Sequence, residues 1–362
     1  MPRHDCNDFT VTMTKLGNKG RFANQIFQYA FLRFVGAQHG YKVECPDWVG
    51  SFLFGHNDPP PSRDYLAWNQ PIGILELHRV TDTVFSYQEA ELHEAQVPLN
   101  RFGGVNFNGH FQFMSLFKKD PSFFRSLFQP VSHLKETLEA QWRWTEGKTV
   151  VAIHLRYDDG GVSQYYEAEL RWVHDWLEKI WPNLKNPVLY IATTQPRVRR
   201  KFKKYETVLA DDVFKDMPDA PFYPDFWAMT QASVLAIANS TFSFAAALLN
   251  EKAAAFFRPV LSSACFAAFE PWDAPTTIFE TTEKLLFWMY LRTQSRDLFK
   301  ALRAIEYDLL LSNDDIDTPL EAYQKQAWEI FTEKSPPDTL AHAIDVKQRA
   351  EELATLKTAL LL

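Results

Sequence analysis

Residues 149–161 are Thr-Val-Val-Ala-Ile-His-Leu-Arg-Tyr-Asp-Asp-Gly-Gly. A continuous apolar run that ends at turn residues is typical of a strand buried on both faces of a parallel sheet. His154 and Arg156 stand two residues apart near the end of this run, so their side chains should point to the same side. Ligands of open α/β sheets bind at that end of the strands. An arginine there suits an anionic ligand such as a diphosphate, although a salt bridge between Arg156 and Asp158 or Asp159 fits the same pattern.

Strand and helix patterns alternate from this stretch onward. The pattern predicts strands at residues 150–154, 188–192, 208–209, 234–238 and 253–257. It predicts helices at residues 165–181, 197–204, 225–232 and 244–250. Such an alternation implies a parallel, doubly wound sheet.

A polar segment, Asn239-Ser240-Thr241-Phe242-Ser243, lies between the last two predicted strands, at the start of a helix. Hydroxyl groups at this place cap the helix. The same hydroxyls and the first amides of the helix would also form a cradle for a phosphate group. The segment alone is compatible with both interpretations.

The N-terminal region contains a second arrangement of strand, loop and helix. A strand at residues 9–13 leads through a loop with Gly17 and Gly20 into an apolar helix that starts near Phe22. The loop lacks the Gly-Lys-Ser/Thr ending of a Walker motif and is not G-x-G-x-x-G. Asn24 and Gln25 are amides at the start of an otherwise apolar helix, so they need polar partners, and a substrate could supply them.

Another predicted strand end carries two polar residues. A strand at residues 105–108 runs into His110 and Gln112. His110 is either a core histidine or a polar group that faces a cleft, and the pattern does not separate the two.

Composition excludes several classes of protein. The 362 residues carry a net charge of −7, with 46% hydrophobic and 23% charged residues, so we expect a globular chain with more than one domain. The negative charge argues against non-specific nucleic-acid binding. Three scattered cysteines suggest reduced thiols and no zinc site, and no apolar run is long enough to cross a membrane. We therefore expect a cytoplasmic protein, or one that is peripheral to a membrane.

The character of the chain changes after Pro271. The remainder predicts helices at residues 279–311, 320–332 and 339–361, which should pack on the rest of the chain or form a homo-oligomer with a second subunit. The expected domains are residues 1–145 on the acceptor side of a cleft, residues 146–275 for the anionic ligand, and a helical extension at residues 276–362.

Four separated motifs together resemble the bacterial α-1,2-fucosyltransferases (glycosyltransferase family 11). The segment from Gly20 to Ala30, Gly-Arg-Phe-Ala-Asn-Gln-Ile-Phe-Gln-Tyr-Ala, is similar to the Gly-Asn-Gln-Met-Phe-Gln-Tyr-Ala opening of that family. Its Gly-Arg-Phe-x-Asn-Gln form is also similar to the protein O-fucosyltransferases. Gly109-His-Phe-Gln112, His154-Leu-Arg156 and Asn239-Ser-Thr-Phe-Ser243 match three further motifs of the bacterial family in the same order.

The resemblance implies an α/β fold of the GT-B type, in which two Rossmann-like domains face each other across a cleft. It implies transfer of fucose from GDP-fucose, with inversion, without a metal and without a cofactor, to a glycan acceptor that ends in galactose. The residues that it places at GDP-fucose are His154, Arg156, Asp225, Asn239, Ser240, Thr241, Phe242, Ser243, Arg21 and Phe22. The residues that it places on the acceptor side are Asn24, Gln25, His110 and Gln112.

Arg156 is the expected stabiliser of the diphosphate and of the transition state, and Asn24 is expected to position the acceptor. A general base is also expected, and the candidates are Asn24, His110, Asp158 and Asp159.

The chain departs from the family at two places. Tyr157 follows His-x-Arg where the family usually has a second arginine, and Phe244-Ala245 replace a pair of aromatic residues. Loss of the second cation leaves other functions open. The fold could use another GDP-sugar or a protein hydroxyl, or it could bind a nucleotide sugar without turnover.

Overall fold

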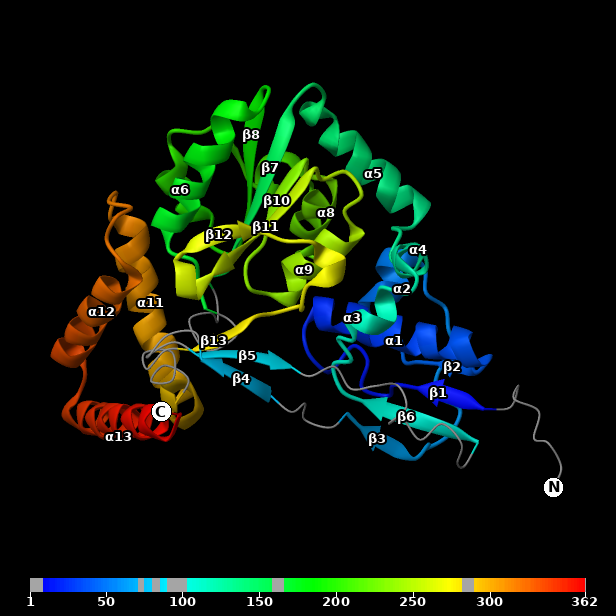
Figure 1. Cartoon of the computed structure of the whole chain (residues 1–362), viewed down its shortest axis with the longest axis horizontal. Helices are drawn as coiled ribbons and strands as arrows, with labels where there is room; N and C mark the ends of the chain where they lie inside the picture. The colour runs from blue at the N-terminus through cyan, green and yellow to red at the C-terminus, as the bar shows by residue number, and fades with distance from the viewer. Residues whose placement is uncertain are drawn as a thin grey trace.

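A computed structural model of the chain describes residues 9–70, 75–79, 85–89, 103–157, 166–281 and 290–361. The described part is an α/β fold with two parallel sheets and a group of C-terminal helices, and this confirms the expected fold class (Figure 1). No helix within the described ranges combines the length and the apolar character that a membrane span needs.

The first parallel sheet is formed by the N-terminal region. Its strands, in spatial order, are β2 (Lys42–Glu44), β1 (Thr10–Thr12), β6 (Gly104–Asn108) and β3 (Ala67–Asn69). Its helices are α1 (Phe22–His39), α2 (Val49–Phe54), α3 (Met114–Phe117) and α4 (Pro121–Ser126). Helix α1 follows β1 through the predicted glycine loop, and Ile26 and Phe27 on it are fully buried. Helix α5 (Ser132–Trp142) leads to the second sheet.

The second sheet confirms the doubly wound arrangement. Its strands, in spatial order, are β12 (Cys265–Ala268), β11 (Ala255–Val260), β10 (Val234–Ala236), β7 (Thr149–Leu155), β8 (Pro187–Thr193) and β9 (Thr207–Val208). All neighbours are parallel except β11 and β12, which are antiparallel. Its helices are α6 (Leu170–Ile180), the 3-10 helix at Pro196–Phe202, α7 (Ala210–Val213), α8 (Tyr223–Gln231) and α9 (Thr241–Leu249).

Side chains of β7 alternate between two hydrophobic cores. Val150 and Ala152 face the core that contains α8 and α9, whereas Val151, Ile153 and Leu155 face the core that contains α6. This alternation decides where the polar residues at the strand end point. His154 continues the series of Val150 and Ala152, so it should face α9.

The C-terminal region differs from the prediction at its start. Residues 279–281, predicted as part of a helix, form strand β13 (Phe279–Thr281). This strand pairs with β5 (Phe85–Glu89), which in turn pairs with β4 (Leu75–Arg79) in an antiparallel sheet. Local helix periodicity was misleading because pairing with a distant strand determines the backbone here.

The described tail includes the helices α11 (Arg296–Ser312), α12 (Leu320–Lys334) and α13 (Pro337–Leu361). Helix α11 begins at Ser295, whose side chain caps the helix by accepting from the Leu298 amide. Leu310 and Leu311 near its end enter the core on the α6 side of the second sheet. The tail is therefore packed against the second sheet (Figure 1).

Candidate functional site

The end of β7 is joined to the start of α9 by two hydrogen bonds. His154 Nδ1 and Ser243 Oγ are 2.8 Å apart, and Arg156 Nη1 donates to Ser240 Oγ at 3.1 Å. Ser240 is also the N-cap of α9, since its hydroxyl accepts from the Phe242 amide at 3.3 Å. The structure thus brings together the His-x-Arg stretch and the polar segment that followed a later strand.

This junction favours an anionic ligand. The N-terminus of α9 carries partial positive charge, and the adjacent guanidinium of Arg156 adds a full charge. Thr241 is the first helical residue there and is partly exposed. The Phe242 ring packs against His154 at 5.4 Å and against Phe226 at 5.4 Å, so it supports the histidine from the side.

Asn239 bonds to a buried arginine that the local sequence pattern did not indicate. Its side chain is buried, and Oδ1 accepts from Arg258 Nη2 at 3.2 Å and from the Ile278 amide at 2.8 Å. Its Nδ2 donates to the Ile278 carbonyl at 2.6 Å. Arg258 is itself buried in β11. A charged residue within that apolar strand is the sequence feature that could have indicated a buried polar partner. Asn239 therefore ties the start of α9 to the segment before β13.

Asp225 lies in the first turn of α8 and bonds to β8, the strand next to β7. Its Oδ1 accepts from Tyr190 Oη at 2.8 Å, and its carboxylate also accepts from the Thr193 amide. Burial raises the pKa of Asp225 to about 7, because desolvation outweighs the two hydrogen bonds, and nearby Asp211 raises it further. A carboxyl group with this pKa changes its charge near neutral pH.

Hydrogen bonds between side chains link the N-terminal region to the segment after the second sheet. Gln112 Nε2 donates to Asn24 Oδ1 at 3.1 Å, and Thr276 Oγ1 donates to Gln112 Oε1 at 2.5 Å. Asn24 belongs to α1 and Thr276 follows β12, so Gln112 connects the N-terminal sheet with the segment after the second sheet. The chain holds the Asn24 amide in one orientation.

Gln25 holds the glycine loop together. Its Nε2 donates to the carbonyls of Gly17 at 3.1 Å and Gly20 at 3.2 Å. The partners that its position required are therefore backbone groups of the loop, and its side chain is buried. Gln28 acts in the same way on Lys19, at 3.2 Å.

Gly20→Ala should destabilise the protein and displace Asn24. Gly20 has a φ of 77°, and a Cβ atom there would lie 2.8 Å from Asn24 Cβ and from Asn24 Nδ2. Gly40→Ala is a matched control, since Gly40 has a φ of 68° and nothing within 4 Å of the added atom. We expect the control to cost about 1–2 kcal/mol for its backbone and Gly20→Ala to cost more, as measured by urea unfolding. Equal losses would show that the contact with Asn24 is harmless.

The remaining predicted residues lie in different surroundings. Arg21 is exposed at the N-cap of α1. Phe22 is buried, with its ring 4.7 Å from Phe222 and 5.0 Å from Phe226, so it belongs to the core between α1 and α8.

His110 has an exposed side chain, so it is not a core histidine, and its pKa is lowered by partial desolvation and by Lys19. Candidate bases Asp158 and Asp159 lie outside the described residues.

Tyr157, the departure from the resembled family, points away from Arg156. It continues the alternation of β7, is buried in the core on the α6 side, and its ring lies 5.7 Å from that of Tyr307 on α11. His154, Arg156, Tyr157 and Glu167 line one narrow pocket. Helix α11 contacts two of these lining residues, since Arg303 and Tyr307 bond to Glu167 and the Tyr307 ring lies beside Tyr157, and no pattern in the tail sequence indicated this.

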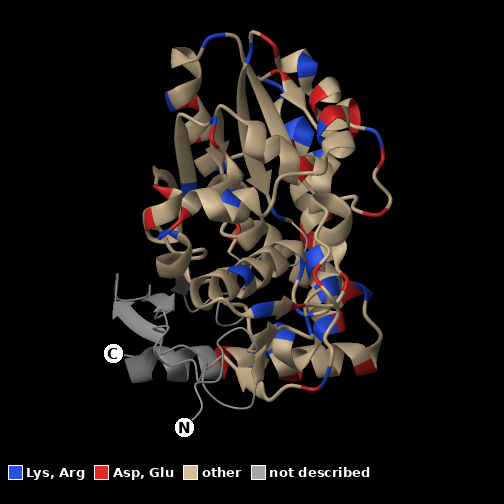
Figure 2. Cartoon of the chain, turned by 90° about the vertical axis from the view of Figure 1, so that its right-hand side faces the viewer, with Lys and Arg blue, Asp and Glu red and all other residues tan. Residues whose placement is uncertain are grey.

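Two arginines of the basic segment at residues 196–202 form ion pairs. In the basic 3-10 helix, Arg197 pairs with Asp308 at 2.8 Å and Arg199 pairs with Asp212 at 2.8 Å. Lys and Arg are mixed with Asp and Glu along the elements in Figure 2. Within the described part of the chain, no three His, Cys, Asp or Glu residues are grouped so that they could hold a metal ion.

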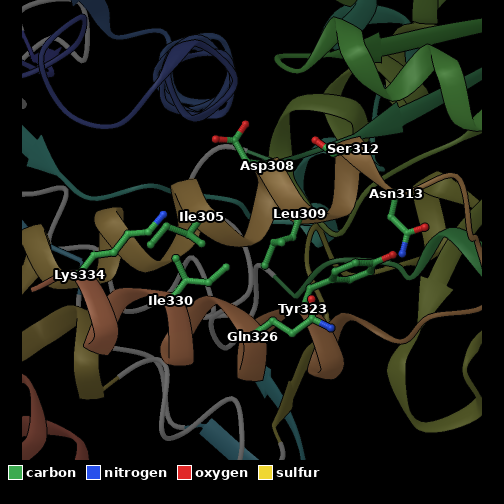
Figure 3. A pocket seen from close by; sticks show the side chains of 9 residues that line it. All are labelled: Ile305, Asp308, Leu309, Ser312, Asn313, Tyr323, Gln326, Ile330 and Lys334. Carbon is green, nitrogen blue, oxygen red and sulfur yellow. The ribbon is translucent and has the colours of Figure 1, made fainter.

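A second hollow lies between α11 and α12, with a volume of about 490 Å³ (Figure 3). Its lining combines Ile305, Leu309 and Ile330 with polar groups such as Asp308 and Lys334. None of the predicted site residues lines it.

Comparison with known proteins gives distant structural matches. No protein-family model matches the sequence, and no curated protein does. A structure of NodZ alpha-1,6-fucosyltransferase soaked with GDP-fucose is 10% identical, with a TM-score of 0.40 over 73% of this chain and 99% of that chain. POFUT1 in complex with GDP-fucose is 14% identical, with a TM-score of 0.40 over 70% and 98% of the two chains. A mutant of FUT1 from Arabidopsis thaliana in complex with GDP is 10% identical, with a TM-score of 0.42 over 72% and 74%.

Proposed function

We propose that the protein is an inverting, metal-independent fucosyltransferase that transfers fucose from GDP-fucose to a hydroxyl of a glycan or glycoconjugate, by an α-1,2 linkage to a terminal galactose. One observation carries the proposal. Arg156 and His154 bond to Ser240 and Ser243, so two motifs that resemble glycosyltransferase family 11 meet at one end of a parallel sheet. Residues 146–275 would bind the donor, and residues 1–145 would face the acceptor.

The donor side has the groups that departure of GDP requires. Negative charge grows on the diphosphate as the bond to fucose breaks, and fixed positive charges and hydrogen-bond donors lower the barrier. Arg156, the Ser240 and Ser243 hydroxyls and the N-terminus of α9 would supply them. Asp225, in the first turn of α8, would accept from guanine N–H groups.

The acceptor side would orient the attacking hydroxyl. Fucose should pass through an oxocarbenium-like transition state, with the acceptor attacking on the face opposite to GDP. Asn24, held by Gln112, would position the acceptor. An amide cannot take a proton at neutral pH, so the general base would be His110, Asp158 or Asp159.

Thermal stabilisation by nucleotide ligands tests this proposal. We expect GDP and GDP-fucose to raise the melting temperature and UDP-sugars to leave it unchanged, since a ligand at 100 times its Kd adds about 2.7 kcal/mol of stability. GDP-mannose is the control for the sugar. If no GDP ligand stabilises the protein, the donor assignment is wrong.

Turnover separates an enzyme from a binding protein. Release of GDP from GDP-fucose in the presence of a panel of galactose-terminated glycans is expected, and it should persist in EDTA. Binding of GDP-fucose without turnover on any acceptor, glycan or protein, would favour a nucleotide-sugar-binding protein, which the change at Tyr157 also makes reasonable. Loss of turnover in EDTA would contradict metal independence.

A further inference from the structure

The narrow pocket beside His154 and Arg156, with a volume of about 10 Å³, is lined by an acidic residue that no motif includes. Glu167 lines the same pocket as His154 and Arg156, and its side chain is 3% exposed. An ionised carboxylate beside Arg156 would attract the guanidinium and repel a diphosphate. Binding of an anionic donor therefore requires that Glu167 be engaged elsewhere.

Both oxygens of Glu167 are engaged by helix α11. Arg303 Nη2 donates to Glu167 Oε2 at 2.5 Å, and Tyr307 Oη donates to Glu167 Oε1 at 2.5 Å. The Arg303 side chain is also 3% exposed and lies over the Tyr307 ring at 4.5 Å. These are charge-assisted hydrogen bonds in a buried setting, where they are strong.

A second carboxylate, Glu306, also bonds to Arg303. Glu306 Oε2 accepts from Arg303 Nη1 at 2.5 Å, and Oε1 accepts from Gln324 Nε2 of α12 at 3.3 Å. Desolvation raises the pKa of Glu306 to about 7, against the opposing effect of Arg303. Arg303 therefore pairs with both carboxylates, Glu167 through Nη2 and Glu306 through Nη1.

Tyr157, the residue that follows Arg156 in the chain, contacts this network. Its ring contacts Tyr307, and burial raises the pKa of its hydroxyl, with Glu167 adding to the shift and Arg303 opposing it. The tail thus contacts the His154–Tyr157 segment from the face opposite to α9.

We propose that Arg303 and Tyr307 are positioning residues for donor binding, which hold the Glu167 carboxylate so that it does not compete with a diphosphate for Arg156. This inference rests on the proposed function. It gives the C-terminal extension a role in the site, through charge and position instead of contact with substrate.

The test compares GDP affinity by isothermal titration calorimetry in variants with and without Glu167. Tyr307→Phe removes one hydroxyl donor and should weaken GDP binding about threefold, and Arg303→Gln with Glu306→Gln should weaken it about tenfold. Adding Glu167→Gln to either variant should restore the affinity to that of Glu167→Gln alone. Urea unfolding of each variant separates the two roles: a purely structural network would lose and regain GDP affinity in step with stability, because Glu167→Gln also removes the buried charge left unpaired.

Tyr323→Phe on α12 is the matched control, because Tyr323 is a buried tyrosine of the tail that bonds to the Asp315 carbonyl and not to Glu167. If the Arg303 variant does not fold, the Tyr307→Phe pair decides alone. Unchanged affinity in Tyr307→Phe, or a loss that Glu167→Gln does not restore, overturns the inference while the proposed function stands. Failure of the wild-type protein to bind GDP overturns both.

Discussion

Arg156→Ala is expected to lower kcat by about 10²- to 10³-fold, the effect of removing one preorganised donor from a developing negative charge. The guanidinium lies at the N-terminus of α9, where the leaving diphosphate would gain charge. The fold should survive, because Ser240 keeps its own bond to the Phe242 amide when Arg156 is removed. Steady-state kinetics with GDP-fucose, together with circular dichroism, checks both statements.

Arg156→Lys serves as the control for this prediction. Lysine keeps the positive charge but cannot form the two-pronged contact of a guanidinium with a phosphate group. We expect its kcat to lie between those of the wild type and Arg156→Ala. Turnover close to wild type in Arg156→Ala would show that Arg156 has no part in the mechanism. Its role would then be the hydrogen bond to Ser240, the N-cap of α9.

Asp225→Asn is expected to weaken GDP binding by about 10- to 100-fold at pH 8, because a hydrogen bond to a charged group contributes about 1.5–3 kcal/mol. Guanine N–H groups need the ionised carboxylate as acceptor. Since the pKa of Asp225 is raised to about 7, the wild-type affinity should rise with pH from 6 to 8. The variant should lack this part of the pH dependence, and subtracting the two profiles removes the ionisation of GDP itself.

The same group affects stability with the opposite sign. Its pKa is about 7 in the folded protein, above the ordinary value of 3.8, so the folded state holds an extra proton between these values. Stability should therefore fall as pH rises through this window, by at most about 4 kcal/mol. Urea unfolding of wild type and Asp225→Asn at pH 5 and pH 8 measures the difference. A pH-independent difference between the two would show that Asp225 is ionised throughout.

Local patterns predicted the second sheet well. The apolar run at residues 149–155 and its successors gave the strands, and the two-residue spacing of His154 and Arg156 placed both on the α9 side. Period-2 spacing is a property of the extended backbone itself, so it can be read without knowledge of the rest of the fold. The strand β13 could not be found in this way, because its conformation depends on pairing with β5.

The sequence by itself determined the sheet, the orientation of His154 and Arg156, and the polar start of α9. Only the tertiary structure decided which distant residues contact the site. Arg258 bonds to Asn239, Gln112 bonds to Asn24, and Arg303 of α11 bonds to Glu167. Periodicity states which side of an element a residue faces, but it does not state which distant element covers that side. For the stretch at residues 149–157, α8 and α9 cover one side and α6 covers the other, and α11 adds Tyr307 beside Tyr157 at the end of the stretch.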